Sequence, residues 1–174
     1  MMQKGFIVIT LAALLFSAQS FSQMPAPDCL DNGETLQFNN DSVLNWKSNT
    51  ANQYHDRAYI QGNLVKAYPD HSGHHHYEVR IGANPSDLVE VIYNEQFGAL
   101  PNDIKPGAKI KACGDYITSN KPSGSMPASP DGAIVHWIHS SNDLAKHDSG
   151  FLIINDIIYG QKNGPNPLQS HSRF

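Results

Sequence analysis

The 174-residue sequence is poor in the features that identify many functional classes. Charged residues make up only 16% of it, and the 12 lysines and arginines are outnumbered by 16 aspartates and glutamates. The resulting formal charge of −4, with the histidines neutral, excludes a general electrostatic attraction to nucleic acid or anionic lipid. A G-x-S-x-G elbow, a phosphate-binding loop, a dinucleotide fingerprint and an H-E-x-x-H helix are all missing. The sequence therefore assigns no catalytic residue.

Long apolar runs are also missing, except at the N-terminus. There "FIVITLAALLF" follows "MMQKG", which carries one lysine, and precedes "SAQSFSQ", which supplies small residues for cleavage. This run is too short to span a bilayer and is typical of a secretory signal. We therefore predict a signal peptide over residues 1–22, cleavage after Ser22, and a periplasmic or secreted protein. The remainder predicts no membrane span.

Cysteine occurs only twice, at Cys29 and Cys113. Export would expose both thiols to oxidising conditions, which favours a disulfide between them. A catalytic thiol is the alternative, but there is no C-x-x-C pair and no third cysteine to resolve an oxidised intermediate. We predict a structural disulfide.

Strand-like patterns dominate what is present. Residues 23–57 form a polar, turn-rich N-terminal arm with one short helix in "DSVLNWKS", capped by Asp41 or Ser42. In "HHYEVRI" the apolar Tyr77, Val79 and Ile81 alternate with polar residues. Five such segments follow one another, at residues 58–68, 75–81, 87–93, 105–117 and 133–139. Short strands with turn signals between them predict a small β-barrel or a β-sandwich.

Side-chain parity adds a prediction for the disulfide. Cys113 shares a strand face with Lys109 and Lys111, so it should point away from the interior. The disulfide would then pin the arm to the outside of the domain. Residues 150–151 and 157–159 predict an added C-terminal β-hairpin, and residues 162–174 predict a disordered tail.

The chain resembles the bacterial domain of unknown function 3465 family over residues 58–160. The resemblance rests on "AYIQGNLVKAYPD", "GHHHYEVRI", "IKPGAKIKACGDY" and above all on the ending "VHWIHSS…KHDSGFLI…IIYG". The matching residues are Gly62, His74, Asn94, Pro101, Gly107, Gly114, Tyr116, His136, Trp137, His139, His147, Gly150, Tyr159 and Gly160. The family's H-H-D-P is replaced by "SSND" at residues 140–143, and residues 118–132 form an insertion. The resemblance implies an OB-like five-stranded barrel over residues 58–161 and export, but no established activity.

Nine histidines, unusually many for this length, raise the question of a metal site. Imidazole is a common metal ligand, and a barrel could bring distant segments together. We predict that a transition metal such as zinc binds at four positions: His74, His136, His139 and His147. On a regular strand His136 and His139 would face opposite ways, so they share one ion only if the strand ends near Ile138. A solvated histidine edge with structural roles and metal-free acid–base chemistry are the alternatives.

Two functions follow from these patterns. The first is an exported OB-like binding module for an oligosaccharide, an oligonucleotide or a protein, with Tyr77 and Trp137 as ligand-stacking residues. The second is a metal-dependent hydrolase of the phosphodiesterase or nuclease kind that uses the histidines as ligands or bases. For each aromatic residue, a place in the core or at the barrel mouth is the alternative.

Overall fold

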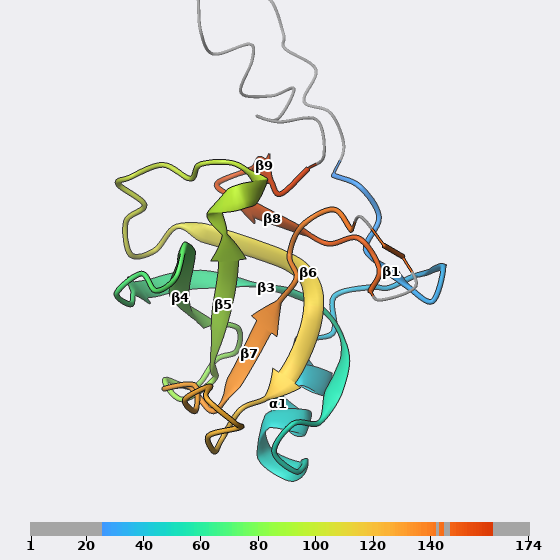
Figure 1. Ribbon diagram of the computed structural model, residues 1–174, viewed down its shortest axis with the longest axis vertical. Helices are drawn as coiled ribbons and strands as arrows, with labels where there is room; N and C mark the ends of the chain where they lie inside the picture. Colours follow the sequence, from blue (N-terminus) through green and yellow to red (C-terminus); the bar gives the residue numbers. More distant parts are fainter. Residues whose placement is uncertain (1–25, 142, 145–146, 162–174) are drawn as a thin grey trace, which may run out of the picture.

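The computed structural model describes residues 26–141, 143–144 and 147–161, and their regular secondary structure is mainly β-strand. The predicted signal peptide and the predicted tail lie outside them. The elements in chain order are β1 (Leu30–Asp31), β2 (Glu34–Thr35), α1 (Asn40–Asn49), β3 (His55–Ala67), β4 (His74–Arg80), β5 (Leu88–Asn94), the 3₁₀ helix η1 (Glu95–Phe97), β6 (Lys109–Thr118), β7 (Ala133–His136), β8 (Phe151–Ile154) and β9 (Ile157–Tyr159). Figure 1 shows their arrangement.

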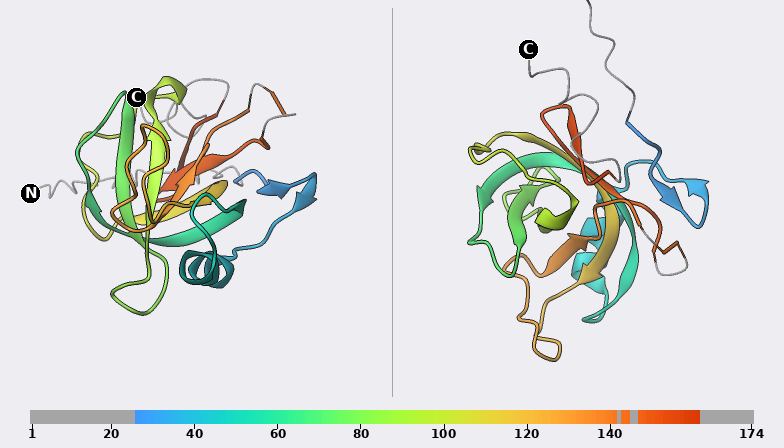
Figure 2. Two further views of the ribbon diagram at one scale, coloured as in Figure 1. Left: turned by 60° about the horizontal axis from the view of Figure 1, so that its bottom comes forward. Right: turned by 45° about the horizontal axis from the view of Figure 1, so that its top comes forward.

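Five of the strands close into a barrel in the order β3-β4-β5-β7-β6, with β6 returning to β3. The β5–β7 pair is parallel and the other pairs of the ring are antiparallel. The long β3 pairs with β6 over residues 55–63 and with β4 from Asn63 onward. Gly62 lies at this change of partner. Because it has no side chain, β3 can approach the carbonyl of Arg80, which a Cβ on residue 62 would overlap. The predicted all-β, OB-like five-stranded barrel is therefore confirmed (Figure 2).

Alternation along the strands decides what lies inside the barrel. The core contains Tyr77 and Val79 of β4, as the sequence pattern indicates, whereas His76 and Glu78 point outward. On β6, Ile110 belongs to the same core. Helix α1 packs against one end of the barrel, where its Trp46 ring lies 5.3 Å from that of Tyr116. No helix within the described residues is both long and apolar enough to cross a membrane.

Helix α1 begins two or three residues earlier than the predicted caps, Asp41 or Ser42, imply. Its N-cap is Asn39, whose side chain makes no capping hydrogen bond. The amide group of Asn39 instead donates to the carbonyl of Arg57 at 3.0 Å and accepts from the amide of Tyr59 at 2.9 Å. The side chain that would cap the helix is thus used to attach the arm to the barrel.

The N-terminal arm is also attached by the predicted disulfide, which joins Cys29 to Cys113. Both cysteines lie in a small second core outside the barrel, together with Phe151 and Ile153 of the hairpin β8–β9. Strand β8 pairs with β6 on this side, so Cys113 lies opposite Phe151. The outward direction of Cys113 and the C-terminal hairpin are both confirmed.

Candidate functional site

The end of β7 is shaped by a residue in an unusual conformation. The strand ends at His136, and Trp137 follows with φ of 50°, in the left-handed region that bulky side chains rarely occupy. This break cancels the strict alternation of the strand. Ile138 enters the core, and the ring of His139 stacks on Phe97 of η1 at 3.5 Å between centroids. Strand β7 therefore ends before Ile138, as is required if His136 and His139 are to share one ion.

Three glycines allow other segments to pack directly against this irregular segment. A Cβ on Gly114 would overlap the carbonyl oxygen of His136, and one on Gly150 would overlap that of Trp137. A Cβ on Gly160 would overlap the carbonyl of Ile138. Because these positions have no side chain, the neighbouring chain segments can lie directly against residues 136–139. Two backbone hydrogen bonds use that proximity: Gly150 donates to His139 at 2.7 Å, and Ser140 donates to Gly160 at 2.6 Å.

The four histidines predicted as ligands lie in one continuous group of rings. The ring of His74, at the start of β4, lies 5.6 Å from that of His136, which stacks on Trp137 at 4.8 Å. Trp137 lies 5.9 Å from His147, and His147 lies edge-on to His139 at 5.4 Å. We call this group, with Phe97 at its end, the ring cluster. Because β4 and β7 both flank β5, residues about 60 positions apart meet at this end of the barrel.

Backbone carbonyls orient three of the imidazoles. The Nδ1 atoms of His74, His139 and His147 lie 2.9–3.0 Å from the carbonyl oxygens of Ser72, Ser140 and Asp148, respectively. A carbonyl oxygen only accepts hydrogen bonds, so each Nδ1 carries the proton and each Nε2 carries the lone pair. Metal-binding imidazoles show this arrangement, in which the second ring nitrogen is held by a backbone or carboxylate oxygen.

The electrostatic environment of His136 and His139 favours their neutral forms. Burial, reinforced by the neighbouring imidazoles of His74, His139, His76 and His147, lowers the pKa of His136 to about 4. Burial also lowers the pKa of His139. At neutral pH both rings are therefore uncharged, which is the form that binds metal ions.

Acidification is expected to destabilise the metal-free protein through His136. Its pKa is lowered on folding from 6.5 to about 4, so the unfolded chain binds the proton more tightly. The stability this residue contributes is complete above pH ~6.5 and is lost progressively down to pH ~4, by about 2 kcal/mol between pH 7 and pH 5. Urea unfolding with a chelator present would measure it. His136→Asn should lose this pH dependence and the exposed His55→Asn should keep it; equal dependence in both would contradict the assignment.

A second group of possible metal ligands lies beside the ring cluster. Asp70, His75 and Glu95 place one ligand atom each within 4.8 Å of one another, and among the described residues this is the only such set. His75 Nδ1 lies 3.0 Å from Asp70, and its Nε2 lies 3.0 Å from Glu95. The four predicted ligands do not form such a set, because their rings meet in pairs, His74 with His136 and His139 with His147.

Sequence reasoning missed Glu95 and did not separate His75 from its neighbours. Glu95 lies two residues after the predicted strand 87–93, and the preceding Asn94 pairs with His74. The pairing of these two strands could therefore have placed Glu95 near the histidines. Phe97 gave no signal, because its contact with His139 depends on how η1 folds over the barrel end.

The two predicted stacking residues differ in position. Tyr77 is 6% exposed and belongs to the barrel core, and burial raises the pKa of its hydroxyl to about 12. Trp137 is half-buried and lies between His136 and His147 in the ring cluster. Of the two, only Trp137 is placed where a ligand of the ring cluster could reach it.

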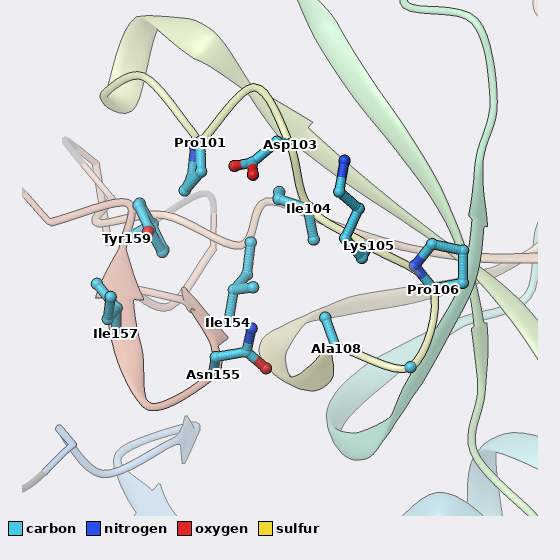
Figure 3. A pocket seen from close by; sticks show the side chains of 11 residues that line it. Pro101, Asp103, Ile104, Lys105, Pro106, Ala108, Ile154, Asn155, Ile157 and Tyr159 are labelled. Atoms are coloured by element: carbon cyan, nitrogen blue, oxygen red, sulfur yellow. The ribbon is translucent and has the colours of Figure 1, made fainter.

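A hollow of about 430 Å³ lies between the loop after η1 and the hairpin β8–β9 (Figure 3). Its walls are mainly apolar, with Ile104, Ile154 and Tyr159 facing one another and Asp103 and Lys105 at the rim. None of the predicted site residues lines it. The hollow therefore adds no chemical group to the ring cluster.

Comparisons with protein-family models, with curated proteins and with solved structures found no match. The case for function accordingly rests on the geometry of the chain itself.

Proposed function

We propose that this protein is an exported OB-like binding module that holds a transition-metal ion at the ring cluster. Nε2 atoms of four histidines would be the ligands: His74, His136, His139 and His147. Because no three of these side chains place ligand atoms within 4.8 Å of one another in the structure, the two ring pairs would have to move toward each other when the ion binds. The observation that carries the proposal is the orientation of three of these rings, whose Nδ1–H groups are held by backbone carbonyls. Nitrogen ligands of this kind suit zinc, copper and nickel better than magnesium or calcium.

Two further observations support the proposal. The lowered pKa values of His136 and His139 remove competition between protons and a metal at neutral pH. The strained backbone of Trp137 and the three glycines around it form an arrangement that costs stability, as is common where a protein binds a ligand.

Export is supported by the signal-like N-terminus and is compatible with the disulfide. Membership of the domain of unknown function 3465 family is part of the same proposal.

Metal analysis of the purified protein tests the proposal. After exposure to zinc, copper or nickel and dialysis, we expect about one equivalent of metal to remain bound. The double variant His136→Ala/His139→Ala should bind at least about 100-fold more weakly, because two of the four ligands are gone. Isothermal titration calorimetry would measure the affinities, and circular dichroism would verify that the variant is folded.

Matched control variants locate the metal. His75→Ala removes the central residue of the neighbouring Asp70–His75–Glu95 set, and His55→Ala removes an exposed histidine on β3. Both controls should retain the wild-type affinity. Loss of binding in His75→Ala with retention in the double variant would transfer the site to that set, and absence of binding at micromolar metal would refute a metal function.

A further inference from the structure

A tyrosine hydroxyl contacts two buried carboxyl groups on the outer side of the barrel, away from the ring cluster. Tyr68 follows β3, Glu78 lies on β4, and Asp131 lies in the connection between β6 and β7. The Tyr68 hydroxyl oxygen is 2.7 Å from Glu78 Oε2 and 3.1 Å from Asp131 Oδ1. Glu78 is 7% exposed and Asp131 is 8% exposed. The three groups therefore interact with little screening by water.

Counting protons shows that one hydroxyl cannot fully satisfy both carboxyl groups when both are ionised in this geometry. A tyrosine hydroxyl has one proton and can donate it to one carboxylate. Glu78 is the ionised partner, because Lys66 Nζ also lies 3.1 Å from its Oε2. The same hydroxyl proton is then shared with Asp131 at 3.1 Å, and only a protonated Asp131 could form a full hydrogen bond with the hydroxyl oxygen. Asp131 Oδ2 is buried and has no hydrogen-bond partner among the described residues, as expected for a group that lacks a compensating cation.

The charges that face Asp131 point the same way. Glu78 and Glu90 add negative charge from β4 and β5, whereas the hydrogen bond from Tyr68 and the charge of Lys47 on α1 act in the opposite sense on the pKa of Asp131. Glu90 is itself paired with His76 at 2.7 Å. Burial first, and then these carboxylates, raise the pKa of Asp131 to about 6. Burial acts in the same sense on Glu78, but hydrogen bonds from Tyr68 and Lys66 hold the pKa of Glu78 below its ordinary value.

Asp131 is also where the long connection over residues 119–132 attaches to the outer side of the barrel. Nearby hydrogen bonds orient it: the Ser129 amide donates to the carbonyl of Ser119, and the Asp131 amide donates to the Ser129 hydroxyl. The connection, drawn in orange, lies below β5 and β7 in Figure 1. Much of the preceding part, including Met126 at 67% exposure, is solvent-exposed. The contact with Tyr68 therefore adds to the hydrogen bonds that attach this segment at Ser119, Lys121 and Ser129.

We propose that a proton held by Asp131 latches the 119–132 connection onto Tyr68 and Glu78, and that loss of this proton releases the connection. The ionised form would place a second carboxylate, which has no paired cation, beside that of Glu78 around one hydroxyl proton in a buried site. This device does not depend on metal binding at the ring cluster.

The direction of the pH effect follows from the two states. In the released state Asp131 has its ordinary pKa of 3.8, whereas in the latched state the pKa is about 6. The latched state therefore binds the proton roughly 100-fold more tightly. Below pH ~4 both states are protonated and the latch is strongest. The equilibrium constant for release should rise roughly 100-fold between pH ~4 and pH ~6 and then remain constant.

Amide hydrogen exchange measured by NMR tests the latch. After correction for the intrinsic pH dependence of exchange, protection of the Ser129 and Asp131 amides should fall by roughly 100-fold from pH 4 to pH 7. The amide of Val91, in the core strand β5, would report global unfolding. In Asp131→Asn, which is neutral at every pH, protection should be independent of pH, whereas the exposed Asp103→Asn should behave like wild type.

A carbon-13 titration of the Asp131 carboxyl group in the wild-type protein gives an independent measurement. We expect a midpoint near pH 6. A midpoint near 4 would overturn the proposal, and so would pH-independent protection of Ser129 in the wild type. Retention of the full pH dependence in Asp131→Asn would show that another group is responsible and would also overturn it.

Discussion

Replacing Cys29 and Cys113 together with alanine is expected to lower the free energy of unfolding by about 4.5 kcal/mol. The disulfide joins residues that are 84 positions apart, and a cross-link of that span removes a large amount of entropy from the unfolded chain. Both cysteines are almost fully buried, so the packing of Phe151 and Ile153 is weakened as well. Urea unfolding of the oxidised wild type, the reduced wild type and the double variant would measure the effect.

The same change should also weaken the ring cluster. The arm that the disulfide attaches contacts the segment that carries His147 once directly and once through the side chain of Arg57 on β3. The Asn32 amide donates to Asp148 at 2.8 Å, and the Arg57 side chain, which also donates to the arm at Leu30, donates to the carbonyl of Ser149 at 2.7 Å. We therefore expect lower metal affinity in the reduced protein. A loss of less than about 1 kcal/mol of stability, outside the 2–5 kcal/mol usual for such disulfides, would contradict a structural role.

Replacing Gly150 with alanine is expected to cost about 3 kcal/mol or more of folding stability. The new methyl group would overlap the carbonyl oxygens of Cys113 and Trp137 and would press on the Cα of Ile138. All three are backbone atoms of the barrel wall, so the strain cannot be relieved by a side-chain rotation. Displacing residue 150 would also break its 2.7 Å hydrogen bond to His139. Thermal and urea unfolding would measure the loss.

Gly124→Ala is the matched control for this substitution. Gly124 lies in the 119–132 connection, and a Cβ there would meet no atom within 4 Å. Its φ of 56° is left-handed, so the cost should be about 1 kcal/mol from backbone strain alone. If Gly150→Ala is no more destabilised than Gly124→Ala, the close approach that holds residues 136–139 is not a determinant of stability.

Local patterns in the chain were sufficient for several features. The alternation in "HHYEVRI" placed Tyr77 and Val79 in the core, and parity placed Cys113 outside the barrel, where the disulfide lies. These predictions hold because the two-residue period of a strand relates each side chain to its neighbours without reference to the rest of the fold. Predicting the disulfide required only the presence of two cysteines and the expectation that the protein is exported.

Only the tertiary structure decided how the site residues meet. The left-handed Trp137, which ends the alternation and brings His139 to Phe97, lies where Gly114, Gly150 and Gly160 of other segments allow close approach to residues 136–139. The contact between Tyr68, Glu78 and Asp131 likewise joins three segments that are separate in the chain. Such contacts depend on strand register and barrel closure, which are set by the packing of the whole core and leave no short-range pattern in the sequence.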